Sequence, residues 1–245
     1  MTDINGFTIG GFISMNHGII MTESPPEIFP ERDVEVISIP GRSGDIVKDN
    51  GRYKNVPIPY KCAYLPEDDQ TMRHDAIYVI GALQPTTEYR RLENTYDPDH
   101  FRMARVSSSI TLKSLVEQIG TFQVMFDCKP QRFLKLGEQT VEFTTPGVLR
   151  NPTLFPAKPI ITIYGTGAGT VTVGDQTVIV KSIEDQITLD CDHQHAYRQV
   201  GEGASENMNT NISAPIFPQL PAGENTVSWT GDIERVEIIP RWWTV

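Results

Sequence analysis

The stretch from Asn55 to Leu65, NVPIPYKCAYL, alternates apolar residues with others over nearly its whole length. This period of two is typical of a β-strand with one buried face, because successive side chains of a strand point to opposite sides. The predicted buried face holds Val56, Ile58, Tyr60, Cys62 and Tyr64, and the other holds Pro57, Pro59, Lys61 and Ala63. Since proline cannot donate to a neighbouring strand, Pro57 and Pro59 place this strand at a sheet edge or beside a bulge.

The rest of the chain is also rich in predicted strands. Its 18 prolines and 19 glycines separate short apolar runs throughout the sequence, as in proteins made mainly of β-structure. Further strands are predicted within residues 114–134, 186–190 and 225–243. Strands around two glycine turns are expected in 160–180, and residues 86–106 are expected to be extended with a turn at Asp97-Pro98-Asp99.

One helix is predicted, over residues 65–83. It opens with Pro66 and three acidic residues, which suit the positive end of a helix dipole. Apolar residues then recur at helical spacing, and Pro85 ends the pattern.

A boundary between two domains is predicted within residues 144–159. This stretch holds four prolines and a glycine without a usable period, as linkers do. A chain of 245 residues is long enough for one large or two small domains. We therefore expect a mainly β protein, with an N-terminal α+β domain at 1–145 and a C-terminal β-sandwich at 146–245.

The composition excludes several classes of function. A net charge of -10 disfavours nucleic-acid binding, which needs a basic surface to neutralise phosphates. No apolar run approaches the length of a membrane span, and the start MTDINGFTIGGF is not predicted to be a signal peptide. Cys62, Cys128 and Cys191 are odd in number and far apart, so a reducing compartment and no disulfide framework are expected.

Two stretches suggest chemistry but lack its context. YGTGAGTV, Tyr164–Val171, contains GxGxG, yet a strand-like run follows where a dinucleotide site needs a helix, so a hairpin is favoured. LDCDHQHAY bunches the possible metal ligands Asp190, Cys191, Asp192, His193 and His195. Neighbouring side chains of a strand point to opposite faces, and no second cluster completes a site. We expect no catalytic residue, no cofactor, no metal and no enzymatic activity.

The stretch ISIPGRSGDIV raises a choice between a phosphate loop and a hairpin turn. A phosphate loop needs Lys and then Ser or Thr after its second glycine, whereas here Asp45 follows Gly44. Alternating apolar residues precede the stretch, and Asn50-Gly51 is a strong tight-turn dipeptide. The prediction is strand, turn, short strand, turn, strand. Arg42 either pairs with Asp45 across the turn or reaches a neighbouring chain.

Taken in order, several segments resemble the distal tail (Dit) proteins of long, non-contractile-tailed phages of Gram-positive bacteria. The segments are INGFTIGGF, PGRSGDIVKDNGRYKNVPIPY, EYRRLENTYDPDHFRMARV, FDCKPQRFL, NPTLFPAKPIITIYGTGAGTVTV and GDIERVEIIPRWW. The resemblance covers nearly the whole chain. PGRSGD and IIPRWW give it most of its weight, and the residues singled out as an assembly or structural motif are Pro40, Gly41, Arg42, Gly44, Asp45, Pro240, Arg241 and Trp242.

The resemblance implies a structural protein of the virion. Such proteins form a hexameric ring at the tail tip, docked on the tail tube on one side and on the tail-associated hub or lysin protein on the other, after assembly in the host cytoplasm. The N-terminal domain is then similar to tail-tube proteins and builds the ring. The C-terminal domain is a galectin-like β-sandwich that supports receptor-binding proteins in some phages. No specific nucleic-acid or membrane binding is implied, and the acidic charge is expected to line the lumen through which DNA passes.

Two rival functions are weighed against this one. The first is a carbohydrate-binding protein that uses exposed rings of the C-terminal sandwich, for which Tyr197, Trp229, Trp242 and Trp243 are available. Tryptophans in closing strands are more often core residues, because each buries a large apolar area. The second is a cell-wall hydrolase, for which no paired acid and base or zinc pattern is present.

Overall fold

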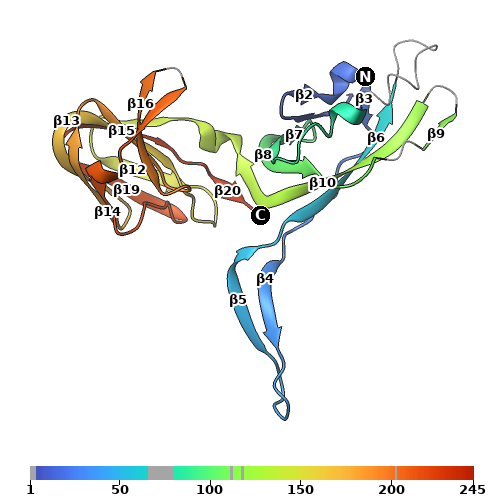
Figure 1. Cartoon of the computed structure of the whole chain (residues 1–245), viewed down its shortest axis with the longest axis horizontal. Coiled ribbons are helices and arrows are strands. Elements are labelled where there is room, and N and C mark those ends of the chain that lie inside the picture. The colour runs from blue at the N-terminus through green and yellow to red at the C-terminus, as the bar shows by residue number, and fades with distance from the viewer. Residues whose placement is uncertain (1–3, 66–79, 111–112, 117–118, 202) are drawn as a thin grey trace. The chain divides into compact units, whose positions relative to one another are not determined.

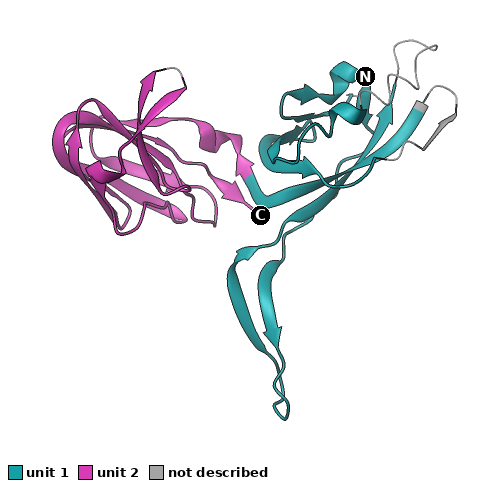
Figure 2. Cartoon of the chain, in the orientation of Figure 1, with its two compact units in different colours: residues 1–132, 245 teal, residues 133–244 magenta. Residues whose placement is uncertain are grey.

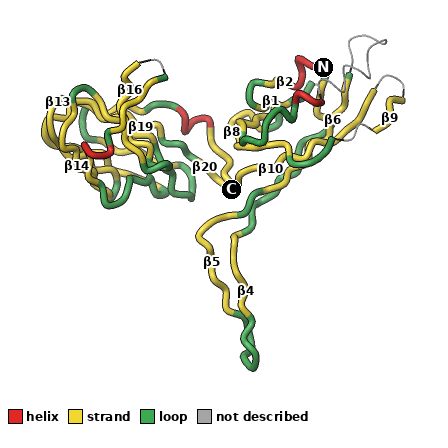
Figure 3. The backbone as a smooth tube through the Cα atoms, viewed as in Figure 1, coloured by secondary structure: helices red, strands yellow, loops and turns green. Residues whose placement is uncertain are grey.

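The computed structural model describes residues 4–65, 80–110, 113–116, 119–201 and 203–245, and they form mainly β-strands (Figures 1 and 3). The chain divides into two compact units, residues 1–132 with Val245 and residues 133–244 (Figure 2). The division lies ahead of the boundary predicted at 145. It does so because β11 (Val141–Phe143) and β12 (Gly147–Asn151) both pair with β19 (Gly223–Ile239) of the second unit.

The first unit is built on one sheet in the order β2-β1-β7-β8-β10-β6-β3, with β9 also paired to β10. Its elements are β1 (Phe7–Ile9), β2 (Phe12–Ile13), the 3-10 helix η1 (Ser14–His17), β3 (Ile19–Met21), β6 (Val56–Tyr64), β7 (Arg90–Asn94), β8 (Asp97–Val106), β9 (Lys113–Val116) and β10 (Ile119–Leu134). The rings of Phe7, Tyr60 and Phe126 meet edge to face at the centre of its core. The predicted helix falls mostly on residues 66–79, outside the described residues. Residues 80–82 are helical and end ahead of Pro85.

Strand β6 has the predicted alternation of buried and more exposed residues from Val56 to Cys62, and β10 pairs with it from Val56 to Tyr64. Ala63, predicted on the other face, is also buried. On its other side, β3 pairs with only its last three residues, and the amide of Thr22 donates to the Lys61 carbonyl. Main-chain groups two residues apart point the same way along a strand, so those of Pro57 and Pro59 face away from β10. The prolines therefore lie along an edge, as predicted, over the part of β6 that β3 leaves uncovered.

The turn between β7 and β8 lies just before the residues that were predicted to form it. Thr95 and Tyr96 form it, whereas Asp97-Pro98-Asp99 opens β8. The Asn94 side-chain oxygen accepts the amides of Tyr96 and Asp97 at 3.0 and 3.1 Å, which closes an Asx turn. Proline is tolerated in the first residues of a strand, so Asp97-Pro98-Asp99 continues the chain without a turn.

The second unit is one curled sheet in the order β11-β19-β13-β15-β16-β17, with β12 on β19 and β14 on both β13 and β18. Its remaining elements are the 3-10 helix η2 (Lys135–Glu138), β13 (Ile160–Val173), β14 (Gln176–Ile183), β15 (Gln186–Asp190), β16 (His195–Gly201), β17 (Ala204–Asn207), η3 (Asn209–Asn211), β18 (Ile212–Ser213) and β20 (Trp243–Thr244). The long strand β13 pairs with β19 from Ile160 to Val173, with irregular register in the middle. Their fully buried residues, such as Ile161, Val171 and Val236, form the centre of the core.

The glycine-rich stretch of β13 is a strand bulge and not the predicted hairpin turn. Pairing of β13 with β19 shifts register between Tyr164 and Gly169, where β13 also changes its second neighbour from β15 to β14. A Cβ on Gly165 would fall inside contact distance of the Asp232 carbonyl oxygen, and one on Gly169 would strike that of Thr230. Glycine is needed here because two backbones approach closely at the bend. The second predicted turn, at Gly174-Asp175, is present.

Candidate assembly interface

A β-hairpin of the first unit pairs with no other strand of the described chain. Its strands are β4 (Arg32–Ile37) and β5 (Ile46–Tyr53), which pair only with each other (Figure 1). Every side chain in them is exposed except Asp33 and Tyr53, which are half-buried. A two-stranded hairpin alone is marginally stable in water, so this element needs further contacts to be held firmly.

The half of the hairpin next to the turn is apolar on both of its faces. Val36 lies opposite Val47 on one face, and Ile37 lies opposite Ile46 on the other. Val36 and Val47 are 59% and 61% exposed. Strands with apolar side chains on both faces are typical of positions covered from both sides. This half therefore has the composition of a buried element, yet its side chains are exposed among the described residues.

The half of the hairpin next to the sheet is polar and charge-balanced. Cross-strand ion pairs join Arg32 to Asp49, Asp33 to Arg52, Glu35 to Lys48 and Glu31 to Lys54. Most of these side chains are exposed, so each pair contributes little to stability. Their charges cancel, so this half is polar and electrically neutral. The other half is apolar.

The PGRSGD stretch forms the turn of this hairpin, as predicted, and its glycines supply the left-handed backbone that the turn requires. Gly41 and Gly44 have φ of +82° and +85°. Pro40, Arg42 and Asp45 are exposed, and no ion pair between Arg42 and Asp45 is present in the described structure. The second predicted turn, Asn50-Gly51, is wrong: both residues lie inside β5, in a bulge opposite Arg32–Val34. Gly51 fits there because a bulge also accepts positive φ, +74° in this case.

The other predicted motif, IIPRWW, belongs to the interior of the second unit. Arg241 has an unusual φ of +58°, and its guanidinium donates to both carboxylate oxygens of Asp190 at 2.9 and 3.3 Å. Its amide donates to the Gly137 carbonyl, and Trp242 is 3% exposed. After Pro240 the motif thus adds a buried tryptophan to the core, and Arg241 bonds to two other parts of the unit. The structure places it in a different unit from PGRSGD.

The possible metal ligands do not converge. His193 contacts Asp190, whose carboxylate is shared with Arg241, whereas His195 lies beside Asn209. No group of three or more His, Cys, Asp or Glu side chains suited to a metal is found among the described residues. Burial raises the pKa of the Cys62, Cys128 and Cys191 thiols to about 12, so they behave as small apolar residues.

Most of the aromatic side chains considered for sugar binding pack against the core of the second unit. Trp242 is buried, and Trp229 and Trp243 pack against the same core at half-buried positions. The Trp243 indole also donates to the Pro156 carbonyl at 3.0 Å and stacks on Phe155. Tyr197 is half-buried beside His195. This arrangement matches the expectation that the tryptophans are core residues.

Two polar clusters at the base of the hairpin were not predicted. In the first, the Asp127 carboxylate accepts hydrogen bonds from Asn55, Tyr89 and Arg105 at 2.9, 2.8 and 3.0 Å. Its side chain is 18% exposed. Burial acts to raise the pKa of Asp127, but the hydrogen bonds from Tyr89, Asn55 and Arg105 outweigh it, so that pKa is lowered.

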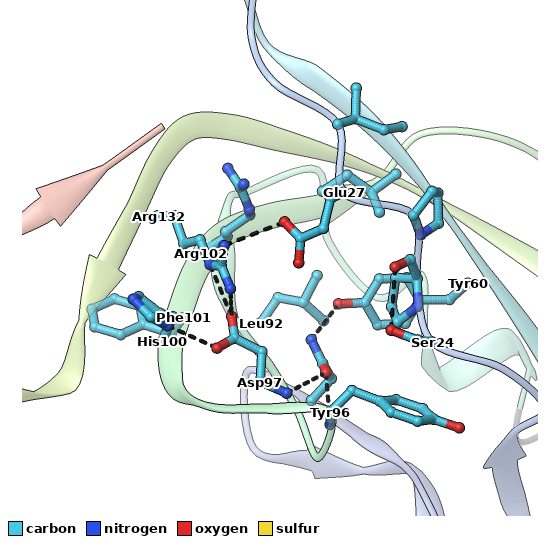
Figure 4. Close-up of a pocket in the computed structure, with 15 residues that line it drawn as sticks. Ser24, Glu27, Tyr60, Leu92, Tyr96, Asp97, His100, Phe101, Arg102 and Arg132 are labelled. Atoms are coloured by element: carbon cyan, nitrogen blue, oxygen red, sulfur yellow. Dashed lines mark hydrogen bonds and ion pairs between the residues drawn. The ribbon is translucent and has the colours of Figure 1, made fainter.

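The second cluster lines a small cavity of about 60 Å³ (Figure 4). Arg132 donates to Asp97 at 2.9 Å and to Glu27 at 3.3 Å, and Asp97 also contacts His100 at 2.7 Å. The Tyr60 hydroxyl, at the back of the cavity, accepts from Asn94. The bonded residues are up to 105 positions apart in the sequence, so no local pattern could have revealed the cluster.

Comparisons with known proteins agree with this fold. Residues 16–128 match the family model described as the phage tail protein RIFT-related domain. The Dit protein (gp 19.1) of phage SPP1, described as a paradigm of hub adsorption apparatus in Gram-positive infecting phages, matches with a TM-score of 0.73 at 12% identity, covering 96% of this chain and 98% of that one.

A weaker structural match comes from a chain of the phage P2 baseplate in its activated conformation with Ca. Its TM-score is 0.50 at 8% identity, and it covers 96% of this chain and 98% of that one. No curated protein sequence matches the chain. In the part of the chain that the structure describes, no helix is long and apolar enough to cross a membrane. Residues 16–128 thus match the phage tail protein RIFT-related domain, and the fold of the chain is similar to that of SPP1 Dit over nearly its whole length.

Proposed function

We propose that this chain is a structural protein of a phage tail tip and that six copies form a ring there. The tail-protein domain at residues 16–128 supports a role in the tail, and the fold shared with SPP1 Dit supports a place in the baseplate hub. In this role the protein acts by binding other proteins and catalyses no reaction.

The observation that carries the proposal is the uncovered hairpin β4–β5. Its apolar half needs cover on both faces, and a second copy of the chain supplies it in the simplest way. A contact in which the hairpin of one copy binds a different surface of the next is heterologous, and such contacts close into a ring when the rotation between copies divides a full turn. An element that extends from its own domain is suited to that geometry.

The ring has two axial faces for two kinds of partner. We place the tail tube protein on one face and the tail-associated hub or lysin protein on the other, with receptor-binding proteins as a further partner. DNA leaves through the lumen, whose wall takes part of the net charge of -10 and repels the phosphates. The site of action is the virion tail tip, reached after assembly in the host cytoplasm.

A matched pair of double variants tests the proposal. Val36→Asp with Val47→Asp puts charges on one face of the hairpin, whereas Val148→Asp with Val200→Asp changes two valines of the second unit that are each 55% exposed. Light scattering and negative-stain images over a range of concentrations should give six times the 27.4 kDa mass of the chain for the wild type and the control. The hairpin variant should be monomeric.

A wild type that stays monomeric even when the tube and hub proteins are added would contradict the ring. A hairpin variant that assembles as well as its control would contradict the hairpin as the contact between copies. A neutral or basic lumen in a structure of the ring would contradict only the proposed charge of its wall. Titration with host-wall polysaccharide tests the rival carbohydrate-binding function, which no contact in the structure favours.

A further inference from the structure

The base of the hairpin is fixed to the sheet at two separate points. The chain enters the hairpin after Glu27 and leaves it at Asn55, and the amide of Lys54 donates to the Glu31 carbonyl at 2.9 Å where the two strands meet. Glu27 is bonded to Arg132 and Asn55 is bonded to Asp127. The segment that leads into β4 and the segment that follows β5 thus each have a polar contact with β10.

The two contacts lie on opposite faces of the sheet. Asp127 opposes Pro57 on the outer face of β6, whereas Arg132 lines the cavity that Ile58 and Tyr60 bound from the core side. Side chains of a strand separated by an odd number of residues point to opposite faces, as these two do. Contacts from both faces resist tilting of the hairpin in either direction, which neither contact does alone.

The two contacts also differ in strength. The Asp127 carboxylate is 18% exposed and takes three hydrogen bonds, so its contact with Asn55 is well shielded. Glu27 is 64% exposed, and an exposed ion pair of this kind contributes little on its own. Removing the Asn55 contact should therefore matter more than removing the Glu27 contact.

Small errors in hairpin direction have large consequences for a ring. Neighbouring copies are related by about 60° in a ring of six and by about 51° in a ring of seven, so a change of roughly 10° at each contact alters the number of copies or leaves the ring open. We infer, on the basis of the proposed function, that Asp127 and Arg132 are positioning residues. They fix the direction of the hairpin and thereby the number of copies in the ring.

A graded series of variants tests this inference without touching the apolar half of the hairpin. Asn55→Ala removes the amide from Asp127, and Asn55→Asp places a second carboxylate against it. Glu27→Ala removes the weaker contact. The matched controls are Asn16→Ala, an exposed residue of η1, and Glu224→Ala, an exposed residue of β19, neither of which takes part in the base clusters.

Native mass spectrometry and negative-stain classes then count the copies in each assembly. The variants should assemble as readily as the wild type but with several-fold fewer closed rings of the wild-type size, replaced by other sizes and open arcs. The effect should rise from Glu27→Ala to Asn55→Ala to Asn55→Asp. Circular dichroism checks that each variant is folded.

The outcomes separate this inference from the proposed function. Wild-type ring sizes in all three variants would overturn the inference and leave the ring intact. Loss of all assembly in these variants would also overturn it, because the apolar contacts remain and should still join copies at a wrong angle. A wild type that never forms rings would instead count against the proposed function itself.

Discussion

The two glycine-rich stretches of the chain, in the β4–β5 turn and in β13, look alike in sequence but lie in opposite surroundings. A Cβ built on Gly41 or Gly44 meets nothing within 4 Å. One built on Gly165 or Gly169 strikes the backbone of β19. Glycine serves backbone conformation in the first stretch and close approach of two strands in the second.

The difference separates two demands on the sequence. The β13 bulge lets one strand serve two parts of the curled sheet, so it is part of how the second unit folds. The hairpin turn is exposed in the part of the chain that the structure describes, so we expect folding of its unit not to depend on it. Substitutions at the two places should therefore affect different measurements.

The largest expected effect comes from Gly165→Ala. The added methyl group meets the Asp232 carbonyl, which cannot move without breaking the pairing of β13 with β19, so we expect a loss of about 3 kcal/mol or more in the stability of the second unit. Urea unfolding followed by tryptophan fluorescence measures it, since Trp229, Trp242 and Trp243 all lie in that unit.

The matched control for this substitution is Gly201→Ala at the end of β16. A Cβ there meets nothing within 4 Å and the backbone is not left-handed, so stability should stay within about 1 kcal/mol of the wild type. Equal losses in both variants would show that close approach is not the reason for glycine in β13.

A smaller effect is expected from Asp190→Asn. Burial acts to raise the pKa of Asp190, but hydrogen bonds from Arg241 and His193 outweigh it and hold that pKa well below the ordinary 3.8. The unfolded chain therefore binds this proton more readily, and the stabilisation is complete above pH 3.8 and is lost as the pH falls below it. Neutralising the side chain should remove about 2 kcal/mol at pH 7.

Urea unfolding of the second unit at several pH values measures both parts of this prediction. The stability of Asp190→Asn should fall less steeply than that of the wild type below pH 3.8. Asp175→Asn, at an exposed turn residue, is the control and should keep the wild-type profile. If Asp190→Asn kept the full loss of stability at low pH, that loss would have to come from other carboxylates.

The smallest effect on folding is expected from Arg42→Ala in the hairpin turn. Arg42 is exposed, so the stability of the first unit should change by no more than about 0.5 kcal/mol. Ring formation at low protein concentration should weaken, as the hairpin proposal requires. Circular dichroism on urea unfolding and light scattering on dilution measure the two effects, and normal rings at the lowest concentrations would exclude a role for Arg42 in the interface.

Local patterns predicted much of the first unit. The alternation in β6 identified that strand and most of its buried face, because one side of the sheet is covered and the other is not. A strand was also predicted where β10 lies. PGRSGD was correctly predicted as a turn. Its glycines sit between two apolar runs that pair only with each other, so the local sequence contains all the interactions that decide the structure.

The errors arose where pairing with another strand decides. Asn50-Gly51 and the β13 glycines have the composition of turns, but a bulge also uses glycine. The choice depends on pairing with β4 in the first case and with the distant β19 in the second. The base clusters were missed for the same reason, since Asn55 and Asp127 are 72 residues apart. The sequence shows a charged or amide side chain, but it does not show which residue so far away is its partner.

Pro57 and Pro59 have a consequence for how the protein behaves while it is still a free subunit. The edge of β6 that they form offers carbonyl acceptors but lacks the amide donors at those two positions, so an unrelated strand cannot extend the sheet across it. Off-pathway aggregation through this edge is thereby suppressed. The uncovered hairpin then remains the proposed site of contact between copies.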